Sequence, residues 1–199
     1  PYTGVGTSVA VLDSGFDKTH SVFSSLPHVT DDSQLMIKQG DVRKALAATD
    51  NKLNAVKTTA GLKFSDVWFS NKIPFSYDYA DKDADVFPYD SEHGTHVAGI
   101  IAASNNKTGI VGVAYNAKIM AIKAGQATGV FLQSDIAEAI IYAYTHGADV
   151  INMSFGGGAC SIAVQDALQA AYTTSTLVAA AGNDGKPNEK TDNYKEYVA

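Results

Sequence analysis

Four short apolar runs along the chain predict buried β-strands. Each is rich in Val, Ile, Leu or Ala, and they cover residues 8–12, 117–122, 148–153 and 176–181. Between them, apolar residues recur every three to four positions, which predicts helices that follow His93, Ser134 and Cys160. Ser134 is the predicted N-cap of the middle helix, and His146-Gly147 is its predicted C-terminus.

The alternation of strands and helices predicts an α/β fold. It favours a parallel β-sheet with helices on both faces and right-handed crossovers. Continuously apolar strands are typical of a sheet that is covered on both sides. Residues 21–90 interrupt the alternation with a possible helix near residues 35–48 and a stretch rich in Tyr and Asp. We expect this region to be an excursion from a single core.

Composition excludes several classes of protein. With 45% hydrophobic and 18% charged residues, the chain can bury one substantial core and is not expected to be disordered. A net charge of -6 without a basic stripe argues against nucleic acid or an anionic membrane as a partner. The single Cys160 excludes an internal disulfide framework. No apolar run reaches the ~18 residues of a transmembrane segment.

The residues that directly follow the predicted strands carry the candidate chemistry, because functional groups collect at the carboxyl edge of a parallel sheet. Asp13 ends the first strand, His93 opens a helix, and Asn183 follows the fourth strand. A buried carboxylate can orient a histidine, and a side-chain amide can donate to an oxyanion. The run Gly156-Gly157-Gly158 leaves backbone open to an extended peptide. Taken singly, each of these residues is more often a turn, a cap or a surface position.

Four segments together resemble the subtilisin-like serine proteases. The matching segments are Val9-Ala10-Val11-Leu12-Asp13-Ser14-Gly15, His93-Gly94-Thr95-His96-Val97-Ala98-Gly99, Asn152-Met153-Ser154-Phe155-Gly156 and Ala180-Ala181-Gly182-Asn183. The resemblance implies a three-layer subtilisin-like sandwich of which residues 1–199 are the N-terminal portion, incomplete at the C-terminus. It also implies serine endopeptidase activity on polypeptides.

The resemblance also implies roles for individual residues. Asp13 would be the orienting acid, His93 the general base and Asn183 the oxyanion donor. The substrate-binding residues fall into two groups. Ser154, Phe155 and Gly156 would line the substrate strand, and Ala180, Ala181 and Gly182 would wall the specificity pocket. No cofactor is expected for catalysis.

The catalytic serine is missing from the expected motif. Gly6-Thr7-Ser8-Val9-Ala10 matches the letters of the family's serine motif, but Ser8 begins the strand that ends at Asp13. At ~3.3 Å per residue the two lie roughly 17 Å apart, far beyond hydrogen-bond reach. We therefore expect a C-terminal part of the protease, beyond residue 199, to supply the serine.

Two features resemble the cell-envelope proteinases of Gram-positive bacteria, the lactocepin and C5a-peptidase group. One is the long separation of Asp13 and His93, and the other is the segment Lys72-Ile73-Pro74-Phe75-Ser76-Tyr77-Asp78-Tyr79-Ala80-Asp81. This narrower resemblance implies a bacterial protein that is secreted or anchored at the cell surface. The chain opens at Pro1-Tyr2-Thr3 without a charged segment before an apolar core, so we expect that any targeting segment has been removed. The loop Asn105-Asn106-Lys107-Thr108-Gly109-Ile110 resembles a subtilase calcium loop, which makes Asn106 a candidate calcium ligand.

Other readings of the motifs fit less well. Gly4-x-Gly6 precedes its strand, whereas a dinucleotide-binding loop follows it. His93 and His96 are spaced by three residues, and helical zinc motifs space their histidines by four. The acidic residues from Asp81 to Glu92 resemble a calcium-binding EF-hand loop, but Val86 stands where that loop needs glycine. A non-catalytic, protease-like peptide-binding module stays open as the alternative.

Overall fold

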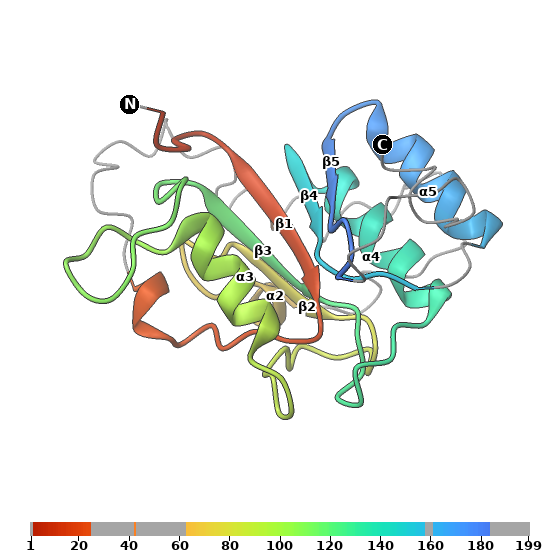
Figure 1. The fold of residues 1–199 in the computed structure, drawn as a ribbon, viewed down its shortest axis with the longest axis horizontal. Coiled ribbons are helices and arrows are strands. Elements are labelled where there is room, and N and C mark those ends of the chain that lie inside the picture. The colour runs from red at the N-terminus through yellow and green to blue at the C-terminus, as the bar shows by residue number, and fades with distance from the viewer. Residues whose placement is uncertain (1, 25–41, 43–62, 158–160, 184–199) are drawn as a thin grey trace.

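A five-stranded parallel β-sheet forms the centre of the molecule (Figure 1). The computed structural model describes residues 2–24, 42, 63–157 and 161–183. The strand order is β2-β3-β1-β4-β5, and every neighbouring pair is parallel. The strands are β1 (Ser8–Asp13), β2 (Phe75–Asp78), β3 (Lys118–Lys123), β4 (Val150–Met153) and β5 (Thr176–Ala179). The α/β class with a parallel sheet is therefore confirmed.

The helices lie close to where the periodicity predicts them. They are η1 (Ser21–Phe23, a 3-10 helix), α2 (Phe64–Val67), α3 (His93–Ala102), α4 (Gln133–Thr145) and α5 (Ile162–Tyr172). The prediction of Ser134 as the N-cap of α4 is wrong, because the helix begins earlier and Leu132, in extended conformation, is its N-cap. Its C-terminus is as predicted: His146 is the C-cap, and Gly147 adopts a φ of +86° that favours glycine.

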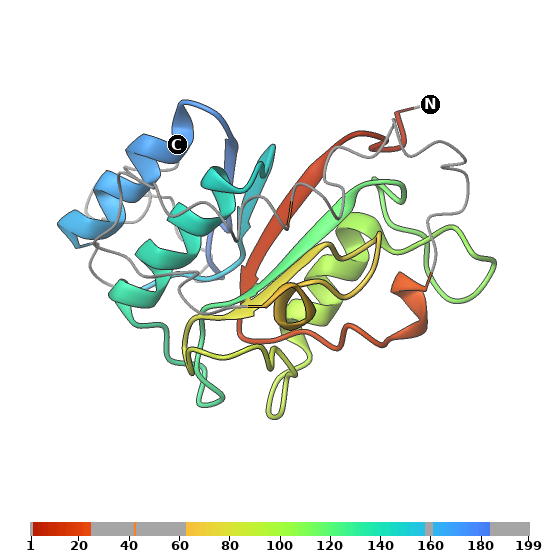
Figure 2. The same cartoon turned by 180° about the vertical axis from the view of Figure 1, so that it is seen from behind.

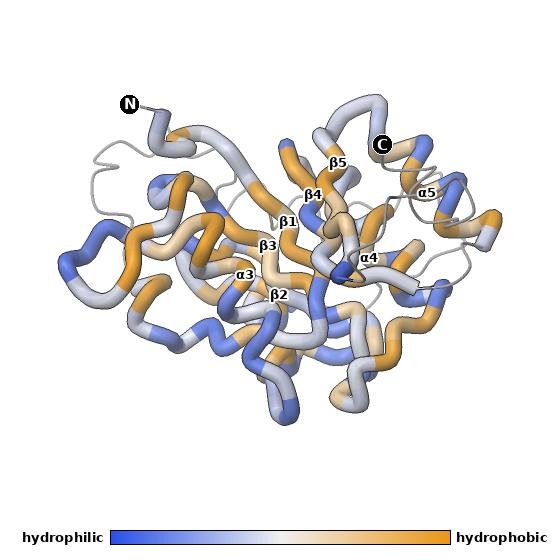
Figure 3. Tube along the Cα trace, viewed as in Figure 1, coloured by the Kyte–Doolittle hydropathy of each residue, from blue (hydrophilic) through white to orange (hydrophobic). Residues whose placement is uncertain are grey.

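Two apolar layers cover the sheet, one on each face. Side chains alternate along β1, so that Ala10 and Leu12 point to one face and Val9 and Val11 to the other. The first pair packs with residues of α4 and α5, and the second pair packs with residues of α3. Figure 1 looks onto the face that carries α3, Figure 2 shows the molecule from behind, and Figure 3 shows apolar residues along the central strands. The helices thus lie on both faces, as predicted.

The connection from β2 to β3 has the opposite hand to the connection from β3 to β4. The steps β2 to β3 and β3 to β4 run in the same direction across the sheet. The first step passes through α3 on one face, and the second passes through α4 on the other face. Two parallel connections that move the same way on opposite faces have opposite hands, so the expectation of right-handed crossovers throughout is wrong. The connection through α3 runs from residue 79 to 117 and is an exception to the strong right-handed preference of parallel crossovers.

The region expected as an excursion contains a strand of the sheet. β2 lies at the edge and pairs with β3, but its polar residues Ser76 and Asp78 conceal it in the sequence. Both are fully buried and have partners: Lys18 Nζ donates to Ser76 Oγ, and Lys123 Nζ donates to Asp78. The possible helix near residues 35–48 lies outside the described residues, apart from Val42.

Lys72 is a buried lysine whose charge makes the fold sensitive to pH. Its side chain is 2% exposed, and Nζ donates to the backbone oxygens of Tyr115 and Ala117 at 2.8 and 2.7 Å. Burial lowers the pKa of Lys72 from 10.5 to about 7. Between these values the unfolded chain binds a proton that the folded chain does not, so stability rises with pH in this window.

We therefore expect the wild-type protein to gain about 4 kcal/mol of stability relative to Lys72→Met as the pH rises from about 7 to about 10.5. Urea unfolding of both proteins at several pH values measures this gain. The other titrating groups cancel in the difference between the two proteins. A difference that does not change with pH would contradict the prediction.

Candidate active site

Asp13 and His93 form a hydrogen-bonded pair at the carboxyl edge of the sheet. Asp13 is the last residue of β1, and His93 is the first residue of α3. Nδ1 of His93 lies 2.9 Å from Oδ1 and 3.0 Å from Oδ2 of Asp13. The aspartate side chain is 2% exposed and the histidine side chain 52% exposed. Because a carboxylate accepts, Nδ1 carries the proton, and Nε2 stays available as a base.

The start of α3 can approach Asp13 because position 94 has no side chain. A Cβ at Gly94 would lie 2.3 Å from the backbone oxygen of Gly15 and 2.8 Å from Cβ of Asp13. Gly15 is constrained as well, since its φ is +150° and its own Cβ would lie 2.7 Å from Cα of Pro88. The two glycines therefore allow the backbone after β1, the backbone before α3 and the helix start to pack directly together.

Further hydrogen bonds orient the Asp13 carboxylate and its backbone. The backbone N–H of Ser14 donates to Oδ1 at 2.8 Å, and the Ser14 hydroxyl donates to the same atom at 3.3 Å. The backbone oxygen of Asp13 accepts from the N–H groups of Ala124 and Gly125, which follow β3. The aspartate is thus held both at its side chain and at its main chain, and this orients the carboxylate toward the imidazole.

The predicted substrate strand follows β4 at the same edge. Asn152 Nδ2 donates to Ser154 Oγ at 2.9 Å, and among the described residues no neighbouring atom lies within 4 Å of a Cβ built on Gly156. The ring of Phe155 stacks on Phe131, with centroids 4.4 Å apart and planes at 22°. Phe131 belongs to a loop after β3, so this contact bridges over the end of β1. Sequence reasoning missed Phe131, since nothing in the local pattern indicates its partner.

The predicted pocket wall and oxyanion donor follow β5. Ala180, Ala181, Gly182 and Asn183 are exposed, and Gly182 has a φ of +85°. The backbone N–H of Ala180 donates to Met153 O, which ties this segment to the end of β4. Because β5 is parallel to β4, all of these residues lie beyond the edge that carries Asp13. Among the described residues of this edge, a hydrogen bond joins Asp13 with His93. Asn183 lies beyond the same edge and its amide is exposed.

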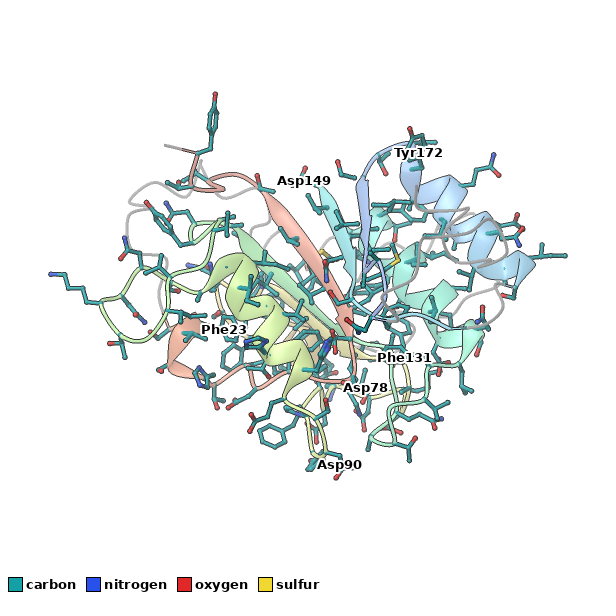
Figure 4. The ribbon with its side chains drawn as sticks, viewed as in Figure 1. Phe23, Asp78, Asp90, Phe131, Asp149 and Tyr172 are labelled. Atoms are coloured by element: carbon teal, nitrogen blue, oxygen red, sulfur yellow. The ribbon has the colours of Figure 1, made fainter. Side chains whose placement is uncertain are left out.

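Ser8 and Asn106 lie away from this edge. Ser8 is the first residue of β1, fully buried, and its N–H donates to Asp149 at the opposite end of the sheet from Asp78 and Phe131 (Figure 4). Asn106 Nδ2 donates to Ser21 O and Ser24 Oγ, and its Oδ1 accepts from Thr108 N. In the part of the chain that the structure describes, no three His, Cys, Asp or Glu side chains group as metal ligands.

A buried aspartate hydrogen-bonded to an exposed histidine at the carboxyl edge of a parallel α/β sheet is an arrangement that occurs in hydrolases that activate a nucleophile through a histidine. The sequence matches the Subtilase family over residues 4–198, so the chain belongs to this family. The family resemblance read from the sequence is therefore confirmed.

Known relatives are bacterial proteases. The chain is 44% identical over 128 residues to a thermophilic serine proteinase of Bacillus sp. (strain AK1). The aligned part covers 63% of this chain and 31% of that protein. The chain is 33% identical over 219 residues to the PII-type proteinase of Lactococcus lactis subsp. cremoris, covering 98% of this chain and 10% of that protein. An extracellular protease of Xanthomonas campestris is 34% identical over 92% of this chain and 30% of its own length.

Solved structures agree on the fold. A protease of Pseudoalteromonas arctica PAMC 21717 superposes with a TM-score of 0.62 at 31% identity, covering 92% of this chain and 51% of that one. The chain thus spans about half of this neighbour, and one third or less of the three curated relatives named above. None of the described helices is long and apolar enough to cross a membrane.

Proposed function

We propose that this chain forms the acid and base half of a secreted serine endopeptidase. The hydrogen-bonded pair of buried Asp13 and exposed His93 carries the proposal. A histidine whose Nδ1 is held by a carboxylate presents Nε2 in the right tautomer to take a proton from a hydroxyl nucleophile. Membership of the subtilase family supports serine as that nucleophile and peptide bonds as the substrate.

The proposed mechanism assigns one role to each group. Nε2 of His93 removes the proton of the serine hydroxyl as its oxygen attacks the scissile carbonyl, and later passes this proton to the leaving amine. Asp13 stabilises the imidazolium formed in between. Nδ2 of Asn183 donates a hydrogen bond to the oxyanion of the tetrahedral intermediate. The extended substrate pairs with the backbone of Ser154 to Gly156, while Ala180 to Gly182 wall the pocket for the residue before the cleaved bond.

We propose that a later segment of the same protease supplies the serine. An open part of the sheet supports this partner. Val150 and Thr176 pair across β4 and β5, as do Asn152 and Val178, and Val150 places these residues on the face that carries α3. Thr176 and Val178 are exposed there, and none of the described helices covers them. An amphipathic helix with the serine at its start would bury this face.

A fluorophosphonate probe on the longer protein that contains this chain tests the proposal, because only an activated serine reacts. We expect covalent labelling of one serine, at a rate that falls sharply in His93→Ala. Absence of labelling in the wild-type protein would favour the alternative, a non-catalytic peptide-binding module that keeps the groove and lacks a nucleophile.

The oxyanion role of Asn183 predicts a specific defect. Asn183→Ala should lower kcat by about 10²–10³-fold, because the amide donor is needed only as charge develops in the transition state. The Michaelis constant should change little. Steady-state kinetics on a peptide substrate measure both values. Unchanged turnover would remove Asn183 from the mechanism.

We also propose a secreted or cell-surface location, like that named for the extracellular protease of Xanthomonas.

We further propose a structural calcium ion at the loop of Asn106. Oxygen ligands suit calcium, and Asn106 Oδ1 keeps a lone pair besides the one that accepts from Thr108. Removing calcium with a chelator should therefore lower the melting temperature of the protease. A melting temperature that is indifferent to chelator would exclude this site. Catalysis is proposed to need no cofactor.

A further inference from the structure

An exposed aromatic pair stands beside the catalytic pair and has no role in the mechanism above. From Val86 to Tyr89 the side chains alternate inward and outward, as in an extended strand. Val86 and Pro88 are buried, whereas Phe87 is 46% and Tyr89 68% exposed. Two exposed aromatic rings that lie next to each other form an apolar patch, and such a patch is a candidate binding surface.

The rings are held in place rather than free to move. Phe87 and Tyr89 contact each other edge to face, with centroids 5.3 Å apart and planes at 70°. The Tyr89 hydroxyl donates to Asp85 Oδ2 at 2.5 Å, and the backbone N–H of Phe87 donates to Asp85 Oδ1 at 3.0 Å. These two hydrogen bonds lower the pKa of Asp85, so the carboxylate remains charged beneath the pair. A preformed surface of this kind loses little entropy when a ligand binds.

The inward-facing residues of this loop, Val86 and Pro88, lie directly against the segment that carries Asp13. The backbone N–H of Phe16 donates to Val86 O at 2.6 Å, and Pro88 fills the space over Gly15. At the other end of the loop, Ser91 Oγ accepts from the backbone N–H of His93. A peptide whose scissile bond lies at His93 would therefore run past this loop with its neighbouring side chains.

The surroundings of the pair are negatively charged. Carboxylates at Asp83, Asp85, Asp90 and Glu92 are exposed, and positions 83–92 contain no Lys or Arg. Figure 4 shows Asp90 at the tip of this end of the molecule. Of the lysines in this region, Lys82 binds Asp135 and Glu138, and Lys123 binds Asp78 and Asp81. Lys18 also acts on Asp85 through its charge, while its Nζ donates to Ser76 Oγ. Aromatic faces surrounded by carboxylates suit a cationic side chain, and a planar guanidinium best of all.

We propose that Phe87 and Tyr89 form a subsite for a basic residue, arginine before lysine, of the polypeptide substrate close to the cleaved bond. This inference rests on the proposed function for the identity of the ligand as a peptide. The rings stack on the guanidinium, and Asp85, Asp90 and Glu92 supply the opposite charge. The two residues are specificity-determining and take no part in the bond-breaking step.

Peptide binding to the longer protein in a His93→Ala background tests the subsite without cleavage. The probes are fluorescent hexapeptides that carry arginine at one position, and the same peptides with citrulline, which keeps the shape and loses the charge. We expect the arginine peptide to bind about 10-fold more tightly than the citrulline peptide. This preference should fall to about 2-fold or less in Phe87→Ser/Tyr89→Ser, since only the carboxylates would remain to favour the charge. Tyr172→Ser is the matched control, since Tyr172 is an exposed tyrosine on α5 that lies far from Asp90 in Figure 4.

The outcomes separate this inference from the proposed function. Equal binding of arginine and citrulline peptides by the wild-type surface would overturn the subsite. The subsite would also be overturned if the Phe87→Ser/Tyr89→Ser variant lost the same affinity for both peptides. An equal loss would indicate damage to the loop and no selective loss of arginine binding. Labelling by a fluorophosphonate, in contrast, decides only whether the protein is an active serine hydrolase.

Discussion

Asp13→Asn should lower kcat by about 10⁴-fold in the protease that contains this chain, with little change in the Michaelis constant. Both oxygens of the Asp13 carboxylate accept a hydrogen bond from the Nδ1–H group of His93. An asparagine amide would offer a donor where the imidazole also donates, so the ring would take the wrong tautomer and lose Nε2 as a base. The buried position of Asp13 also removes water as a replacement acceptor.

Steady-state kinetics on a peptide substrate measure this loss, and circular dichroism checks that the variant is folded. Asp166→Asn is the matched control, because Asp166 is an exposed aspartate on α5 and should leave kcat unchanged. If Asp13→Asn retained wild-type turnover, His93 would not depend on this carboxylate and the proposed triad would be wrong.

Gly94→Ala should damage both stability and catalysis, although the change adds one methyl group. That methyl would lie 2.3 Å from Gly15 O and 2.8 Å from Cβ of Asp13, and backbone cannot move aside as a flexible side chain can. We expect a loss of about 3 kcal/mol in the free energy of unfolding. The start of α3 would shift away from β1, so the hydrogen bond of His93 to Asp13 would lengthen and kcat would fall with it.

Gly99→Ala is the control within the same helix. A Cβ at Gly99 meets only Cδ1 of Ile110, at an ordinary contact distance of 3.7 Å. Since alanine is favoured over glycine inside a helix, this variant should be as stable as the wild type or more stable by up to about 1 kcal/mol. Urea unfolding compares the three proteins. Equal stability of Gly94→Ala and Gly99→Ala would contradict the close packing of α3 on β1.

The sequence indicated most of the sheet because four of its strands are continuously apolar. β2 escaped detection since Ser76 and Asp78 are polar, and their partners Lys18 and Lys123 lie 58 and 45 residues away. The prediction of Ser134 as the N-cap of α4 is wrong for a local reason. Ser134 is a favourable capping residue, but α4 begins before it, and its hydroxyl donates to Asp135 instead.

The candidate site also contains residues that the sequence indicated and residues that it did not. Asp13 and His93 could be named from their motifs, since both occur in local segments with a strong family pattern. The stacking of Phe131 on Phe155 and the aromatic pair of Phe87 and Tyr89 could not be predicted. Loop residues show no periodicity, and their exposure depends on what the rest of the fold places beside them.

What the sequence determined by itself was the α/β class, the family and the candidate acid and base, Asp13 and His93, because short-range patterns of apolar residues and compact motifs carry this information. Only the tertiary structure decided that the carboxylate is buried and within 3.0 Å of the imidazole, that one crossover has the opposite hand, and that part of the sheet is open on the face of α3. These properties arise from packing between segments that are far apart in the sequence. Asp13 and His93 are 80 residues apart, and Val9 pairs with Val150, so no local pattern of apolar residues encodes such contacts.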